Sequence, residues 1–156
     1  MTSVNWLDER EEQAWRSLQL MQVRLTARLG RDLAESGLSY SDYLVLVALT
    51  DQGDGRMRAS ELGRRLGWEQ SRVSHHVARM AARGLVTRES CDSDRRGAYV
   101  RVTPDGRDAI RRAAPGHVAT VRRAFLDRLD PDELDVIGAA ATKVLDALDA
   151  LDAEAG

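Results

Sequence analysis

The sequence predicts a mainly α-helical fold with a small β-wing, in which long helices flank a compact centre. Three observations support this prediction. Apolar residues recur every three or four positions along most of the 156-residue chain, which is typical of amphipathic helices. Between residues 85 and 103 the pattern changes to two short, β-branched runs. Glycine and proline interrupt the helical pattern where helices should begin or end.

The first predicted helix covers residues 7–36, and a second ends at Thr50, with Ser41 or Asp42 as its N-terminal cap. The first helix carries an apolar stripe with one glutamine in it: Trp15, Leu18, Gln22, Leu25, Leu29 and Leu33. Residues 43–49 of the second helix are apolar on every side, so we expect this helix to be buried.

Two shorter helices should form a helix-turn-helix unit. The third covers residues 59–66 and ends at Gly67, and the fourth covers residues 70–83 and stops at Gly84. The residues expected to face the core are Leu62 and Leu66 of the third helix, and Val73, Val77 and Met80 of the fourth. Strands at residues 85–89 and 99–103 should then form a hairpin with a long, charged tip.

A fifth helix should begin at Thr103-Pro104 and a sixth at Asp130-Pro131. Pro115 lies inside the fifth helix and should kink or break it. The apolar stripes are Ile110, Ala114, Val118, Val121 and Phe125 in the fifth helix, then Leu134, Ile137, Ala141, Val144, Leu148 and Leu151 in the sixth.

The chain therefore divides into three predicted parts: residues 1–36, a winged helix-turn-helix domain at residues 37–103, and residues 104–156. The stripes of the terminal helices have no obvious partner inside so small a central domain. A second copy of the chain would bury them. We therefore interpret the terminal parts as dimerisation helices and expect a homodimer.

Composition excludes several classes of protein. The single cysteine, Cys91, excludes a disulfide within the chain and a cysteine-rich zinc site, and we expect no metal or cofactor. The first residues lack the pattern of a signal peptide, and no apolar run approaches the ~20 residues that span a bilayer. We expect a cytoplasmic protein that does not contact membranes.

The net charge of −2 by itself argues against nucleic-acid binding, but its distribution reverses that argument. Residues 56–101 hold 11 basic and 5 acidic side chains, a net charge of +6. Residues 1–55 and residues 102–156 each have a net charge of −4. The positive charge is therefore concentrated in the helix-turn-helix unit and the wing.

The fourth helix has a basic face opposite its apolar one, formed by Arg72, His75 or His76, Arg79 and Arg83. A helix fits the major groove of B-DNA, and the guanidinium group of arginine matches the two acceptors of guanine. Ser71 and Ser74 can donate to phosphates or base edges. A solvated face on an ordinary surface helix is the alternative.

The two adjacent histidines lie about 100° apart around the helix axis, so they cannot easily bind one metal ion together. We therefore expect these histidines to contact DNA instead of a metal ion. Because imidazole titrates near neutral pH, we predict that affinity for DNA rises as the pH falls from about 7.5 to 6.

The hairpin tip is a second basic feature. It places Arg95 and Arg96 on an exposed turn, and an arginine can enter the narrow minor groove of A·T tracts. Asp94 would repel phosphate but can orient Arg96 through a charge-assisted hydrogen bond. A simple Asp–Arg pair at the surface is the alternative.

With these residues in view, the sequence resembles the MarR family of bacterial transcription regulators over nearly its whole length. Residues 84–88, 94–97 and 100–106 look like the wing signature of that family. Residues 60–63 and 71–74 are similar to its third and fourth helices. The resemblance implies a homodimer, held by the first, fifth and sixth helices, on a pseudo-palindromic DNA operator.

The resemblance also implies which residues contact DNA. Helix 70–83 would lie in the major groove and wing 90–97 in the minor groove, with Arg96 favoured over Arg95. Arg58 and Glu69 depart from the family pattern, which often has small capping residues there. The predicted DNA-binding residues are Gln70, Ser71, Arg72, Ser74, His75, His76, Arg79, Asp94, Arg95 and Arg96.

Members of this family often bind a small-molecule effector between the dimer helices and the DNA-binding lobe. Trp15, Tyr40, Tyr43 and His117 could line such a cleft, and core or surface roles are the alternative. Redox sensing by Cys91 is not favoured, because the chain offers no resolving cysteine.

The favoured function is a sequence-specific, double-stranded DNA-binding transcription regulator, most often a repressor in this family. An architectural DNA-binding protein without an effector is the alternative, and it would not select a discrete palindrome. A hydrolase that uses Cys91 with His75 or His76 is a third interpretation. No oxyanion loop, phosphate loop or spaced carboxylate pair accompanies these residues, so we expect no enzyme.

Overall fold

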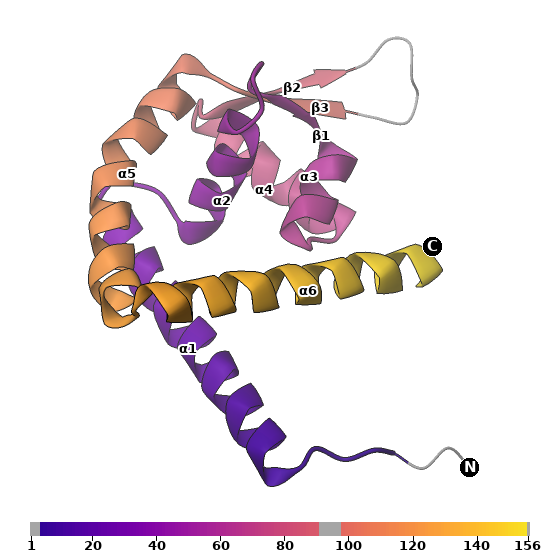
Figure 1. Cartoon of the computed structure of the whole chain (residues 1–156). Helices are drawn as coiled ribbons and strands as arrows, with labels where there is room; N and C mark the ends of the chain where they lie inside the picture. The colour runs from indigo at the N-terminus through magenta and orange to yellow at the C-terminus, as the bar shows by residue number, and fades with distance from the viewer. Residues whose placement is uncertain (1–3, 91–97, 156) are drawn as a thin grey trace. The chain divides into compact units, whose positions relative to one another are not determined.

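The computed structural model describes residues 4–90 and 98–155 (Figure 1). It confirms a mainly α-helical fold with a small β-sheet. The elements in chain order are α1 (Glu9–Ala34), α2 (Tyr40–Thr50), β1 (Arg56–Arg58), α3 (Ala59–Leu66), α4 (Gln70–Ala82), β2 (Val86–Ser90), β3 (Ala98–Val102), α5 (Pro104–Ala124), the 3-10 turn η1 (Leu126–Arg128) and α6 (Pro131–Ala155).

Two compact units make up the chain, Met1–His117 and Val118–Gly156. The three-part division into dimerisation helices and a DNA-binding domain concerns function and stays a prediction. Within the described residues, no helix combines the length and the apolar character needed to cross a membrane.

The first two helices begin with capping boxes. At α1, the Asp8 carboxylate accepts from the Glu11 N–H at 2.8 Å, and the Glu11 carboxylate accepts from the Asp8 N–H at 2.9 Å. At α2, Ser39 and Asp42 exchange equivalent bonds of 3.0 and 2.9 Å. The predicted cap at Ser41 or Asp42 is therefore wrong, because Asp42 occupies the third helical position and reaches back to Ser39.

The sheet contains three strands, one more than predicted. All pairs are antiparallel in the order β1-β3-β2, with Met57 opposite Val100 and Val86 opposite Val102. These four side chains are buried. The sequence pattern did not reveal β1, because a strand of three residues with one apolar side chain is too short for a period of two to be recognised.

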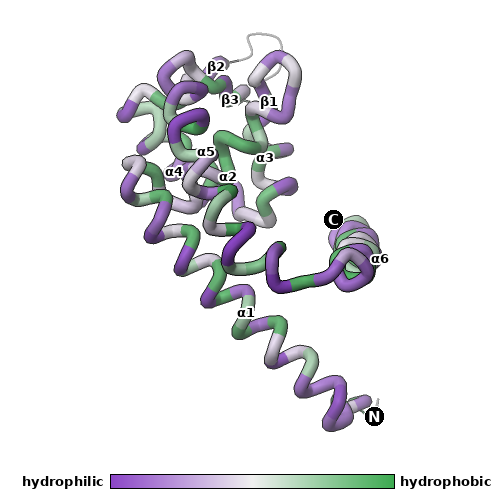
Figure 2. The backbone as a smooth tube through the Cα atoms, turned by 60° about the vertical axis from the view of Figure 1, so that its left-hand side comes forward, coloured by the Kyte–Doolittle hydropathy of each residue, from purple (hydrophilic) through white to green (hydrophobic). Residues whose placement is uncertain are grey.

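The hydrophobic core lies where α2, α3 and α4 gather on one side of the sheet (Figure 1). Hydrophobic colour predominates along α2 but alternates with hydrophilic colour along α1 (Figure 2). Of the stripe on α1, only Leu29 and Leu33 are buried, whereas Trp15 and Leu18 are about half exposed. The first part of α1 therefore has an apolar face that this unit does not cover.

The last helices continue the predicted pattern with one difference. α5 runs through Pro115, so of the predicted kink or break only the break is excluded. In the second unit, α6 begins as predicted, with the Asp130 carboxylate on the Glu133 N–H at 2.8 Å. Most of its apolar stripe is exposed, including Val144, Leu148 and Leu151.

Candidate functional site

The outer face of α4 carries most of the predicted DNA-binding side chains. Val73, Val77 and Met80 are buried, as predicted, and this turns the opposite face of the helix outward. We call the exposed members of the predicted set the recognition face: Gln70, Ser71, Arg72, Ser74, His75 and Arg79.

His76 lies beside this face but is buried, so its predicted place among the exposed donors is wrong. Its side chain is 7% exposed, whereas its neighbour His75 is exposed. A rotation of about 100° between successive residues explains why only one of the two can face outward. Burial lowers the pKa of His76, and the nearby Arg79 charge adds to this, against the opposing effect of Asp42.

Two arginines of the recognition face rest on inward-facing rings. The Arg72 guanidinium carbon lies 4.1 Å from the centre of the Trp68 ring, a cation–π contact. Arg79 Nη2 donates to His76 Nδ1 at 2.9 Å. The Trp68 and His76 rings meet edge to face, with their centres 5.3 Å apart. These contacts hold Arg72 on the face of the Trp68 ring and Arg79 at the edge of the His76 ring, and the two rings touch.

Asp42 connects α2 to α4 at a buried position. Its Oδ2 accepts from Arg83 Nη1 at 2.7 Å, and its Oδ1 lies 3.0 Å from His76 Nε2. The latter contact has the distance of a hydrogen bond but not its direction, so we treat it as electrostatic. Burial raises the pKa of Asp42, but hydrogen bonds from Arg83 and Ser39 outweigh burial and hold that pKa below its ordinary value.

Arg83, predicted on the basic face, is 44% exposed but also has a structural role. Besides Asp42, it donates from Nη2 to the carbonyl oxygen of Gly37 at 2.5 Å. The side chain therefore ties the end of α4 to the corner between α1 and α2. Sequence periodicity could not reveal this contact, because its partners lie more than 40 residues away, at separations of 41 and 46.

The predicted wing residues Asp94, Arg95 and Arg96, together with Cys91, lie outside the described residues. Strand β1, which pairs with β3, carries further basic side chains whose place beside the wing sequence reasoning missed. The guanidinium carbons of Arg56 and Arg58 lie 3.8 and 5.0 Å from the centre of the Tyr99 ring. Arg56 also lies 3.8 Å from a carboxylate oxygen of Glu89, which offsets part of its charge.

The predicted effector-binding residues are only partly brought together. The Tyr43 and His117 rings lie 4.3 Å apart between centres, and burial raises the pKa of Tyr43 and lowers that of His117. His117 Nδ1 is buried and has no hydrogen-bond partner among the described residues. Tyr40 packs against the same core, with its Cβ close to Gly30.

Trp15 does not join this group. It precedes Gly30 by 15 residues, or about 22 Å along α1, and is 53% exposed. A ligand contact of Tyr40, Tyr43 and His117 stays a prediction.

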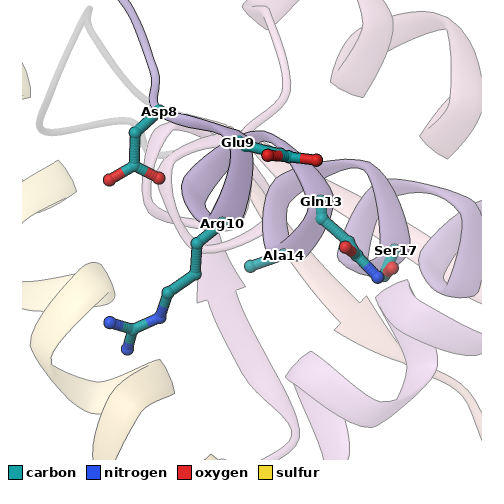
Figure 3. Close-up of a pocket in the computed structure, with 6 residues that line it drawn as sticks. All are labelled: Asp8, Glu9, Arg10, Gln13, Ala14 and Ser17. Atoms are coloured by element: carbon teal, nitrogen blue, oxygen red, sulfur yellow. The ribbon is translucent and has the colours of Figure 1, made fainter.

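Two hollows were considered as alternative sites. One follows the first turns of α1 and is lined by Asp8, Glu9, Arg10, Gln13, Ala14 and Ser17 (Figure 3). Because one helix and its cap provide all of its lining, it is an open helix surface. The second, of about 260 Å³, lies beside α4 between Ser60, Ser74 and Arg88. Within the described residues, no three potential ligands gather as a metal site.

Comparisons with known proteins agree with this geometry. A model of the MarR family matches residues 36–97, which span α2 to the wing. A curated HTH-type transcriptional regulator of Bacillus subtilis, YkoM, is 29% identical over 105 residues. That alignment covers 67% of this chain and 66% of the relative, just under two thirds of its length.

Two solved structures from Streptomyces coelicolor are similar over almost the whole chain. AbsC, a MarR family transcriptional regulator, is 39% identical with a TM-score of 0.87, over 94% of this chain and 99% of that one. Sco3205, a regulator of the same family solved in complex with DNA, is 36% identical with a TM-score of 0.88, over 95% and 93% of the two chains. Because this identity extends across the helix-turn-helix unit and the flanking helices alike, the chain belongs to the MarR family of transcriptional regulators.

Proposed function

We propose that the protein is a sequence-specific, double-stranded DNA-binding transcription regulator that represses its targets. The recognition face of α4 carries this proposal. It combines arginine, histidine, serine and glutamine side chains on one exposed side of a helix whose other side is fixed in the core. These are the side-chain types that read base edges in the major groove.

The distribution of charge supports the same reading. The +6 of residues 56–101 would draw this segment towards phosphate, while the −4 of each flanking segment would keep the flanks away. The DNA complex of Sco3205, at 36% identity, supports a DNA partner for this chain. Arg95 and Arg96 of the wing are proposed minor-groove contacts, with Asp94 as the residue that orients Arg96.

A homodimer is part of the proposal. Exposed apolar side chains remain on α1 and on α6, two of the three helices predicted to hold the dimer. Burying such faces against a second copy would also pair two recognition helices, which suits a pseudo-palindromic operator.

The test begins with selection of duplexes from a randomised DNA library by the purified full-length protein. We expect enrichment of a pseudo-palindrome that binds more tightly than a scrambled duplex of equal composition, with affinity that weakens as salt rises. The ratio of the two dissociation constants defines discrimination. If no sequence is enriched, the architectural alternative is favoured.

Arg72→Ala tests the docking mode. We expect it to reduce discrimination by about 5- to 150-fold, the equivalent of ~1–3 kcal/mol for one base-reading arginine. The matched control is Arg16→Ala, which removes a 76% exposed arginine from α1. Equal binding by both variants would show that α4 does not enter the major groove as proposed.

A further inference from the structure

Below the recognition face lies a pair of buried aromatic side chains, Trp68 and His76, and burial removes His76 from the predicted DNA contacts. Trp68 precedes α4 and is 9% exposed, and His76 lies inside the helix at 7%. Neither ring can reach a base edge from such a position. Each nevertheless touches a side chain that can, because Trp68 lies under Arg72 and His76 accepts from Arg79.

We propose that Trp68 and His76 are positioning residues that hold Arg72 and Arg79 in the orientation in which they read DNA bases. The inference rests on the proposed function and extends it to the residues that determine specificity. A guanidinium group reads guanine through a planar fork, so its orientation decides whether both bonds form. An arginine already held in place loses less rotational freedom on binding.

The chemistry of each contact suits this role. The face of an indole ring attracts a cation and leaves the N–H groups of the guanidinium free for DNA. At His76, Nδ1 must be the unprotonated nitrogen to accept from Arg79, so the proton resides on Nε2. Asp42 Oδ1, 3.0 Å from Nε2, favours that tautomer. The carboxylate is in turn fixed by Arg83 and Ser39.

The helical spacing places each arginine beside its support. Trp68, Arg72, His76 and Arg79 follow one another at intervals of four, four and three residues. Spacings of three and four bring helical side chains close enough to touch, and Trp68, two residues before α4, meets Arg72 in its first turn. The two rings are in edge-to-face contact, and each supports its own arginine.

The experiment uses the full chain, the duplex selected by the wild-type protein and the scrambled duplex of equal composition. Trp68→Leu keeps an apolar side chain but removes the aromatic face. We expect it to reduce discrimination at least fivefold, with unchanged affinity for the scrambled duplex and an unchanged salt dependence. Trp68→Phe keeps a smaller face and should retain most of the discrimination.

A double-mutant cycle distinguishes positioning from general stability. If Trp68 acts through Arg72, Trp68→Leu should cost little further discrimination in an Arg72→Ala background. An equal loss in both backgrounds, or wild-type discrimination in Trp68→Leu, would overturn the proposal for Trp68.

The same design applies to His76 and Arg79. His76→Asn keeps an acceptor near the position of Nδ1 and should retain discrimination, whereas His76→Leu should lose it in the wild-type but not in the Arg79→Ala background. Loss in both backgrounds, or in neither, would overturn this part of the proposal.

Failure of the proposed function would look different. In that case the wild-type protein itself would show no discrimination, or Arg72→Ala and Arg79→Ala would leave it unchanged. Unfolding midpoints measured for every variant identify those that do not fold. Where a leucine variant does not fold, the conservative variant at that position, Trp68→Phe or His76→Asn, tests the proposal. Loss of discrimination in a folded conservative variant contradicts it.

Discussion

His75 and His76 are identical residues with opposite environments. His75 is exposed on the recognition face, and His76 is buried between Asp42, Arg79 and Trp68. The predicted increase in DNA affinity at lower pH can therefore involve only His75 as a direct contact. Protonation of His76 would instead place a hydrogen on Nδ1 and remove the acceptor that Arg79 uses.

Burial of His76 predicts a pH dependence of stability. Its pKa in the folded protein lies below the ordinary value of 6.5, so the unfolded chain takes up the proton first. The free energy of unfolding should therefore fall as the pH drops below about 6.5, by at most ~1.4 kcal/mol per pH unit for one proton. His117, whose pKa burial also lowers, should add to the slope.

Urea unfolding at pH 7 and 5.5, at one protein concentration, measures this dependence. His76→Asn should flatten it, while His75→Asn should leave it unchanged because that side chain is exposed. The lowered pKa of Asp42 acts in the same direction, because the unfolded chain again takes up the proton first, but only near and below its ordinary value of 3.8, outside this pH range. Equal slopes in the wild type and His76→Asn would contradict the explanation.

Helices α3 and α4 approach closely at Gly63. A Cβ there would lie 2.9 Å from the carbonyl oxygen of Trp68 and 2.8 Å from Gln70 Nε2. Backbone at that distance must move, so Gly63→Ala should lower the free energy of unfolding by ~1–3 kcal/mol, the usual effect of overpacking.

The matched control for Gly63→Ala is Gly116→Ala. Gly116 lies within α5, and a Cβ there would meet nothing within 4 Å. Alanine favours helix more than glycine does, so this change should be neutral or stabilising by up to ~1 kcal/mol. Thermal or urea unfolding checks both variants, and similar losses in the two would show that the approach of α3 to α4 is not the cause.

The helices were predictable because their apolar pattern repeats over several turns. Their boundaries were less predictable. The cap of α2 depends on which residue leaves helical geometry, and Ser39, Ser41 and Asp42 all have suitable side chains. In the site, the period of α4 identified the exposed arginines. It could not identify Trp68 or Asp42 as their support, because those contacts arise only when separate elements pack together.

For the whole chain, a net charge of −2 and an isoelectric point of about 5.9 conceal an uneven distribution of charge along the sequence. The basic segment coincides with the helix-turn-helix unit and the sheet, whereas the exposed apolar stripe of α6 lies among acidic residues. Acidic helices are poor surfaces for DNA, but their apolar sides are suited to another protein surface. This unequal distribution is what the proposed DNA contact of α4 and the proposed dimer contact of α6 require.

Leu148→Arg tests whether α6 forms the dimer. Val144, Leu148 and Leu151 share one side of the helix and are 59%, 49% and 59% exposed, so a charge at the middle position would be buried in an interface. In sedimentation velocity, the Leu148→Arg protein should behave as a monomer. A chain that ends after Leu129 should do the same. The control Asp146→Arg introduces the same residue about 160° away around the helix axis and should remain dimeric.

Because a monomer presents one recognition helix, Leu148→Arg should also bind a duplex with two half-sites more weakly, while its affinity for a single half-site stays that of the wild type. A Leu148→Arg protein that sediments as the wild type does would place the interface elsewhere.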